Sequence, residues 1–174
     1  MSNQTYWLFG ISGAGKSTLA QAWQKQWKLL QGKQVVLLEE EVLKLGINSD
    51  LSANVMLKEE LTRRIAEIAK LFNQSGLDVI VCAVTPLESQ RQLASQIIGP
   101  KNFKAIFVDA PVQICQRRDP KGLYVKALSG RMKFFPGVNA IFETPNTSCL
   151  KVNTDQSSVS NCLELIYAEI NANK

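Results

Sequence analysis

The chain has 174 residues, of which 45% are hydrophobic and 20% charged, and it carries a net charge of +5 at neutral pH. This length suits a single domain over residues 1–174, and the longest strongly apolar stretch, residues 79–84, is too short to cross a membrane. The positive charge suits an anionic small molecule as partner, whereas no basic run interleaved with aromatic residues points to nucleic acid.

The N-terminal residues lack the basic and apolar regions of a secretory signal, so we expect a cytoplasmic protein. The four cysteines have no metal-binding spacing, which predicts buried, reduced thiols. The chain has no histidine. This absence excludes histidine-containing triads, and any proton transfer must use a carboxylate, a lysine or water.

Five short apolar runs rich in β-branched and aromatic residues predict strands, with segments of helical periodicity between them. The predicted strands are residues 6–9, 35–38, 79–84, 103–108 and 149–152. One helical stripe comprises Leu61, Ile65, Ile68 and Phe72, and another comprises Val159, Leu163, Ile166 and Ile170. Because the strands are continuously apolar, we expect an α/β fold, a three-layer doubly wound sandwich with a mostly parallel five-stranded sheet. Ligands of such folds bind beyond the carboxyl ends of the strands.

The string GISGAGKS, residues 10–17, follows the first predicted strand and fits the P-loop pattern G-x-x-x-x-G-K-[ST]. Glycines here let main-chain amides converge on phosphates, whereas a plain tight turn would leave the Lys-Ser pair unexplained. Lys16 should reach the β- and γ-phosphates, and the Ser17 hydroxyl should ligate Mg²⁺. The residues expected to bind the nucleotide are Gly10, Ser12, Gly13, Ala14, Gly15, Lys16, Ser17 and Thr18.

Motifs elsewhere in the sequence indicate which class of P-loop protein this is. No guanine-reading N-K-x-D string occurs, and the strand at 79–84 is followed by Thr85 rather than ending in Asp-Glu. Residues 115–135 contain Arg117, Arg118 and Lys121, which could form a basic lid that closes over phosphates. A solvated loop is the alternative for these cations. Together these features favour a small-molecule kinase.

With the P-loop, the string DPKGLY at residues 119–124 and the stretch 134–145, the chain resembles the adenylyl-sulfate kinase family. That family phosphorylates the 3′-hydroxyl of adenosine 5′-phosphosulfate (APS), and the resemblance covers nearly the whole chain. It implies ATP and Mg²⁺ as cofactors, a catalytic and substrate-binding role for Lys121, nucleotide binding by Arg117 and Arg118, and stacking of Phe135 on the substrate's adenine. It also makes a homodimer possible.

Three consecutive glutamates, Glu39, Glu40 and Glu41, follow the second predicted strand. They fall on the family's Asp-Gly-Asp, which implies substrate contact for Glu39. The same resemblance gives Glu41 the catalytic role of activating the acceptor hydroxyl and organising Mg²⁺. The alternative is an acidic first helical turn favoured by the helix dipole, an interpretation that suits Glu40.

Other positions on the acceptor side depart from the family. Lys44 and Lys58 replace two arginines that grip the APS anion, so they keep the charge but lose the planar fork. Leu61 replaces an asparagine that contacts the substrate, and Ala53 replaces a second phenylalanine beside the adenine. Thr85 keeps the hydroxyl of a substrate-side serine, although T-P-L-E also fits a helix capping box, the role that we favour.

The sequence therefore predicts an ATP- and Mg²⁺-dependent adenylyl-sulfate kinase whose donor loop and lid follow the family while its acceptor side differs. A kinase for another anionic, hydroxylated small molecule is one alternative. A nucleotide-binding module without transfer activity is another.

Overall fold

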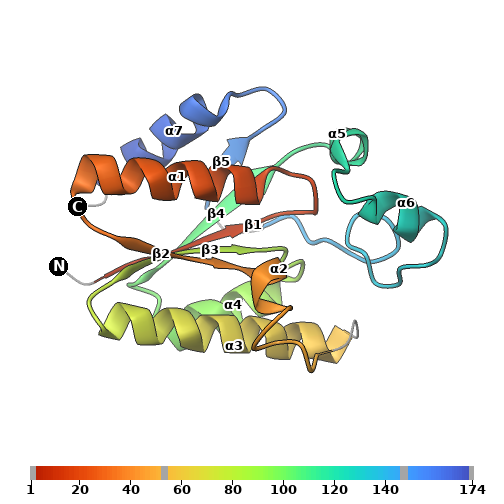
Figure 1. The fold of residues 1–174 in the computed structure, drawn as a ribbon, viewed down its shortest axis with the longest axis horizontal. Helices are drawn as coiled ribbons and strands as arrows, with labels where there is room; N and C mark the ends of the chain where they lie inside the picture. Colours follow the sequence, from red (N-terminus) through yellow and green to blue (C-terminus); the bar gives the residue numbers. More distant parts are fainter. Residues whose placement is uncertain (1–2, 52–54, 146–148, 173–174) are drawn as a thin grey trace.

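The computed structural model describes residues 3–51, 55–145 and 149–172 (Figure 1). Its five strands are β1 Thr5–Phe9, β2 Val35–Glu39, β3 Asp78–Ala83, β4 Phe103–Asp109 and β5 Leu150–Asn153. They form one sheet in the order β2-β3-β1-β4-β5, and every neighbouring pair is parallel. The expected α/β sandwich with a parallel five-stranded sheet is confirmed.

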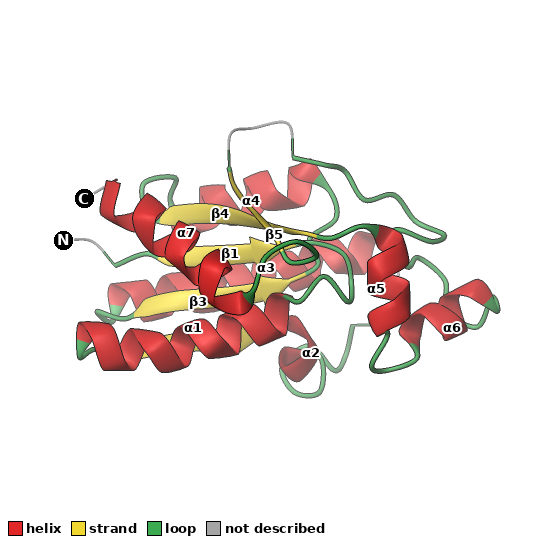
Figure 2. Cartoon of the chain, turned by 90° about the horizontal axis from the view of Figure 1, so that it is seen from above, coloured by secondary structure: helices red, strands yellow, loops and turns green. Residues whose placement is uncertain are grey.

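Helices cover both faces of this sheet, as Figure 1 shows. One face is covered by α1 Lys16–Gln31 and α7 Val159–Ala172, and the other by α3 Val55–Gln74 and α4 Glu88–Ile98. Three short helices, α2 Glu40–Leu43, α5 Val112–Arg118 and α6 Leu123–Leu128, lie at the carboxyl end of the strands. Figure 2 shows α5 and α6 projecting beyond that end. None of the helices in the described residues has the length and apolarity that crossing a membrane needs.

Strand β1 shows why continuous apolar strands suit this arrangement. Alternate side chains enter different cores: Tyr6 and Leu8 pack on the side of α1 and α7, and Trp7 and Phe9 pack on the side of α3 and α4. All four are almost fully buried. Burying a large apolar side chain contributes about 1.5–3 kcal/mol, so the central strand holds the two cores together and fixes the loop that follows it.

The start of α4 differs from the sequence-based expectation. The helix begins at Glu88, after Leu87, and the Leu87 N–H donates to Gln90 Oε1 at 3.4 Å. Thr85 lies before the helix, and its hydroxyl accepts the indole N–H of Trp7 at 2.9 Å. The capping-box prediction for Thr85 is therefore wrong. The reason is that the fully buried Trp7 needs an acceptor for its N–H.

Candidate active site

The loop between β1 and α1 has a backbone that only glycine can adopt at two of its positions. Gly10 has φ 153°, and a Cβ there would lie 2.3 Å from the Val108 carbonyl oxygen. Gly13 has φ 78°, and its Cβ would lie 2.9 Å from the Cys115 carbonyl oxygen. The loop thus curls tightly against β4 and α5, as the P-loop interpretation requires.

Carbonyl groups of this loop are bonded to side chains around it. The four bonds are Lys16 Nζ to Ile11 O at 2.9 Å, Tyr124 Oη to Ser12 O at 2.7 Å, Arg118 Nη1 to Gly13 O at 3.4 Å and Thr154 Oγ1 to Ala14 O at 2.7 Å. Within the described residues, the N–H groups of Gly13 and Gly15 have no acceptor. With its carbonyls occupied and these amides unpaired, the loop is a main-chain anion site at the N-terminus of α1.

Lys16 begins α1 and is only 8% exposed. Burial lowers the pKa of its ammonium group, and the nearby carboxylate of Glu40 opposes this change. Ser17 is half-buried, and its Oγ lies 3.6 Å from Cys82 Sγ at the end of β3, while Thr18 is exposed. A cation and a hydroxyl therefore stand next to the amide-lined loop.

The three glutamates after Leu38 have three different environments. Glu39 ends β2 and accepts a hydrogen bond from Gln21 Nε2 at 2.9 Å. Glu40 is buried and accepts from the Val84 N–H at 2.7 Å and from Lys44 Nζ at 2.5 Å. Glu41 is exposed and contacts Lys121 Nζ.

The pKa of Glu40 follows from these contacts. Burial alone would raise it, but Lys44, the Val84 N–H and Lys16 outweigh burial and lower the pKa below its ordinary value. Glu40 stands in the first turn of α2, as expected, yet its carboxylate is a buried anion between two lysines rather than a solvated one.

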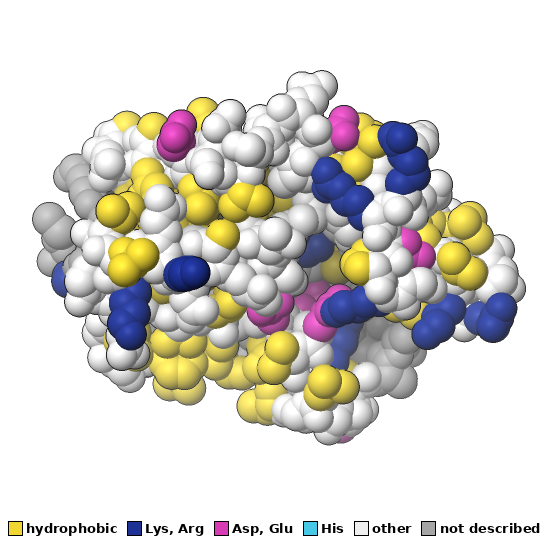
Figure 3. Space-filling view, turned by 45° about the horizontal axis from the view of Figure 1, so that its top comes forward, with side chains coloured by type: hydrophobic (Ala, Val, Ile, Leu, Met, Phe, Trp, Pro, Cys, Tyr) yellow, Lys and Arg dark blue, Asp and Glu magenta, His cyan; other side chains and the backbone are white. Residues whose placement is uncertain are grey.

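The string DPKGLY builds α6 and connects it to the P-loop. The Asp119 carboxylate accepts the N–H groups of Leu123, Tyr124 and Val125 at 2.8, 3.0 and 3.3 Å. The Tyr124 hydroxyl bonds to the P-loop, and Lys121 reaches Glu41 in the first turn of α2. Figure 3 shows basic and acidic side chains together around a hollow between this segment and the body of the molecule. The segment therefore touches both sides of the candidate site.

The two arginines expected over the phosphates behave differently. Arg118 bonds to the P-loop carbonyl of Gly13 and to both Oγ1 and O of Thr154, at 3.1 and 2.7 Å. It thus holds the outer side of the loop in this arrangement. Arg117 is exposed beside it in the last turn of α5.

On the acceptor side, Lys44 is paired with Glu40, and Leu61 is 6% exposed within the core beneath α3. The Leu61 side chain is therefore part of this core. The side chain of Lys58 and the whole of Ala53 lie outside the described part of the chain, so their roles stay predictions.

Thr85 and Phe135 are both buried. Thr85 has φ 38°, a rare conformation for a β-branched residue, and its carbonyl accepts from Arg91 Nη1 at 3.0 Å. The Phe135 ring is 6% exposed and lies edge-on to Tyr124, with ring centroids 4.9 Å apart. Stacking of Phe135 on an adenine stays a prediction, because its ring contact in this arrangement is Tyr124.

Sequence reasoning missed two residues of this site, Glu40 and Thr154. Thr154 directly follows β5 and bonds to both Ala14 O and Arg118. Its position directly after a strand could have identified it, because residues that follow parallel strands lie together at the edge of the sheet where ligands bind. For Glu40, the signal was the spacing of four residues to Lys44.

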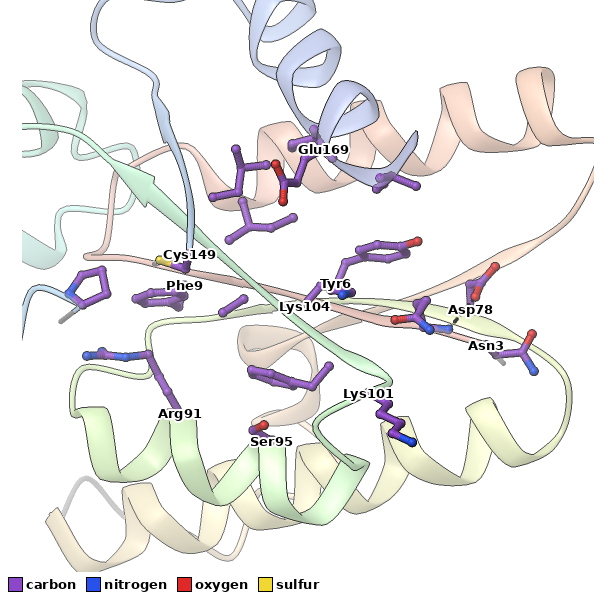
Figure 4. A pocket seen from close by; sticks show the side chains of 18 of the residues that line it. Asn3, Tyr6, Phe9, Asp78, Arg91, Ser95, Lys101, Lys104, Cys149 and Glu169 are labelled. Atoms are coloured by element: carbon purple, nitrogen blue, oxygen red, sulfur yellow. Dashed lines mark hydrogen bonds between the residues drawn. The ribbon is translucent and has the colours of Figure 1, made fainter. Parts of the chain in front are cut away.

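A second hollow, of about 850 Å³, lies away from the P-loop, along the part of β4 that β5 does not cover. Figure 4 shows its side chains on both sides of β4, with Arg91 and Ser95 from α4 on one side and Glu169 from α7 on the other. They do not converge on one point, and no P-loop residue lines this hollow. The chemistry of the molecule therefore belongs to the first site.

An amide-lined loop with a buried lysine, at the carboxyl end of an all-parallel sheet and bonded to a basic segment, defines a P-loop protein of the kinase type. The profile of the family described as adenylylsulphate kinase matches residues 2–153. The chain belongs to the adenylyl-sulfate kinase family.

Individual relatives agree with this assignment. The adenylyl-sulfate kinase of Pseudomonas aeruginosa is 43% identical over 148 residues, which are 85% of this chain and 75% of the relative. That of Paraburkholderia xenovorans is 38% identical over 164 residues, covering 94% and 90%. Among solved structures, the Mycobacterium tuberculosis APS kinase CysC in complex with AMPPNP and APS superposes with a TM-score of 0.89, 33% identity and coverage of 95% and 96%.

Proposed function

We propose that this protein transfers the γ-phosphoryl group of ATP to the 3′-hydroxyl of APS. The observation that carries the proposal is the contact between Glu41 and Lys121. It brings a carboxylate in the first turn of α2 against a segment that is itself bonded to the P-loop through Tyr124. The complex of the Mycobacterium tuberculosis relative with AMPPNP and APS supports both ligands for this chain.

Phosphoryl transfer mainly requires positioning and neutralisation of charge, and the chain supplies both. The amides of Gly13 and Gly15 would bind the donor phosphates together with Lys16. Lys121 would add positive charge when residues 115–135 act as a lid on the single domain 1–174. Glu41 would orient the acceptor hydroxyl and receive its proton, with Glu39 beside it.

Mg²⁺ fits the donor side of this site. The Ser17 hydroxyl is at the start of α1, and its one contact in the described residues is the weak one to Cys82 Sγ. Because Mg²⁺ usually takes few protein ligands and keeps water and phosphate oxygens, Ser17 would be a protein ligand of the ion, and Glu41 would help to organise it. When bound, the ion neutralises charge on the phosphates.

The acceptor residues would be Lys44, Lys58, Lys121, Thr85 and Phe135. A second candidate function, a kinase for another anionic alcohol, is favoured by the burial of Leu61 in the core. A nucleotide-binding module without transfer activity gains less support, since the Glu41–Lys121 contact already joins the two sides of the site. The cytoplasmic location and the homodimer stay predictions.

The test is ADP release by the purified protein with ATP, Mg²⁺ and a panel of acceptors that includes APS. We expect release that depends on APS and that falls by about 10²- to 10³-fold or more in Lys16→Ala, because a preorganised donor to the phosphates is lost. Lys126→Ala, which removes an exposed lysine of α6, is the matched control. Stimulation by another alcohol and not by APS would favour the second candidate, and ATP binding without any turnover would favour the module.

A further inference from the structure

The proposed mechanism leaves the carboxylate of Glu40 unused, although it is the most buried of the three glutamates. The family pattern Asp-Gly-Asp has glycine at this position, so the Glu40 carboxylate is a departure of this chain from the family pattern. A buried carboxylate is costly unless it is paired, and Glu40 is paired at both oxygens.

One oxygen of Glu40 fixes it to the sheet. Oε2 accepts the Val84 N–H just beyond β3, and the Val84 carbonyl accepts the Gly10 N–H at 3.4 Å. Since β3 lies between β2 and β1, these bonds run across the carboxyl end of three strands to the start of the P-loop. These bonds fix the position of the Glu40 carboxylate relative to the P-loop.

The other oxygen of Glu40 holds Lys44. The two partners differ in exposure, because the Glu40 side chain is 10% exposed and that of Lys44 is 51% exposed. The carboxylate is thus the buried anchor, and about half of the Lys44 side chain is exposed. An ammonium has three N–H donors, and the bond to Glu40 uses one of them.

We propose that Glu40 is a positioning residue that holds the Lys44 ammonium ready for the anionic group of the acceptor. The inference rests on the proposed function, in which Lys44 binds that anion. A lysine on its flexible four-carbon stem is a poor substitute for a rigid arginine fork, and a fixed carboxylate partner removes part of that disadvantage. The bond orders the stem before the acceptor arrives, so less freedom is lost on binding.

The experiment compares the wild type, Glu40→Gln, Lys44→Ala and the double variant. Glutamine keeps an oxygen that can accept the Val84 N–H but no longer attracts the ammonium. We expect Glu40→Gln to raise KM for APS by about 3- to 10-fold, the cost of ordering one long side chain. KM for ATP should rise by a smaller factor, because the substitution also removes the carboxylate that acts on the Lys16 ammonium. In the Lys44→Ala background the Glu40 substitution should have no further effect on KM for APS, because contacting residues couple in a double-mutant cycle.

Asp109→Asn is the matched control. Asp109 on β4 and Lys151 on β5 form an ion pair at 2.9 Å, in which the lysine side chain is 57% exposed, much as Lys44 is. The substitution removes the charge of the carboxylate from this pair. This control should leave both KM values unchanged. A merely structural Glu40 would change the melting temperature and both KM values together. An unchanged or lowered KM for APS in Glu40→Gln, or an equal effect with and without Lys44, overturns the inference.

Binding of APS in the presence of AMPPNP, measured by calorimetry on the same four proteins, separates this inference from the proposed function. A wild type that binds APS without turnover contradicts the proposed function alone, and the Kd values then test Glu40 by the same comparison. A wild type that does not bind APS contradicts both.

Discussion

Glu39, Glu40 and Glu41 stand where β2 passes into α2, and each carboxylate has a different partner. The change from strand to helix turns successive side chains in different directions, so one is buried, one half-buried and one exposed. Only Glu41 reaches the segment that would close over a nucleotide. The three glutamates thus differ in burial and in partner because the backbone points their side chains in different directions.

Glu41→Gln tests the role of the exposed carboxylate. If Glu41 receives the acceptor proton, the substitution should lower kcat by about 10²- to 10⁴-fold, the usual contribution of a general base. The affinity for ATP should change far less, since the P-loop is untouched. Steady-state kinetics with both substrates varied would measure the two effects, with Glu59→Gln on α3 as the control. Turnover equal to that of the wild type would remove Glu41 from the mechanism.

At the scale of elements, the sequence predicted every strand to within one residue, for example 35–38 against Val35–Glu39. Continuous apolar runs identify strands covered on both faces. The short helices α5 and α6 were not predicted, because a few residues show no clear period, and of α2 only an acidic first turn at Glu40 was expected. The capping error at Thr85 came from Trp7, since a contact across 78 residues cannot be read from a local pattern.

In the site, too, local patterns could be predicted from the sequence and long-range contacts could not. The P-loop was predictable because its glycines and lysine act within eight consecutive residues. The anchors of that loop, Arg118, Tyr124 and Thr154, come from distant elements, and their bonds to carbonyls depend on the packed fold. Sequence therefore indicates where phosphate binds but not what holds the binding loop in shape.

Asp119→Ala tests whether α6 depends on its carboxylate anchor. The three amides that bond to Asp119 would lose their acceptor, which typically costs about 0.5–2 kcal/mol at a helix start. We expect faster hydrogen exchange at the amides of residues 123–125, by up to about 30-fold, and a raised KM for ATP. Global stability should change less, because the sheet and its four long helices keep their contacts and α6 buries only Tyr124 and Ala127 in the core on the α1 side. Asp119→Asn keeps one oxygen acceptor, so its amides should be better protected than those of Asp119→Ala. Unchanged protection in Asp119→Ala would show that α6 has another source of stability.

At the scale of the whole molecule, charge and pH act together. At neutral pH, 20 Lys and Arg face 15 Asp and Glu, so protonation of the carboxylates would leave the cations unbalanced. Some carboxylates are also stabilised in the folded state. Arg63 and Arg64 donate to Glu60 at 2.6 and 2.9 Å, and Arg64 also holds Asp50 and the Ile47 carbonyl. These bonds attach the segment after α2 to α3.

Acid should remove this attachment in a defined range. Hydrogen bonds from Arg63 and then Arg64 lower the pKa of Glu60 to about 2, below its ordinary value of 4.5. A carboxylate whose pKa is lowered by folding stabilises the protein above its unfolded pKa, and this contribution is lost as the pH falls from about 4.5 toward 2. We therefore expect Glu60→Gln to be less stable than the wild type at neutral pH, with a difference that shrinks at about pH 3. Urea unfolding at the two pH values would measure it, and Glu59→Gln would show the effect of losing an exposed charge alone. A difference that stays constant with pH would mean that the glutamate contributes through packing rather than through its charge.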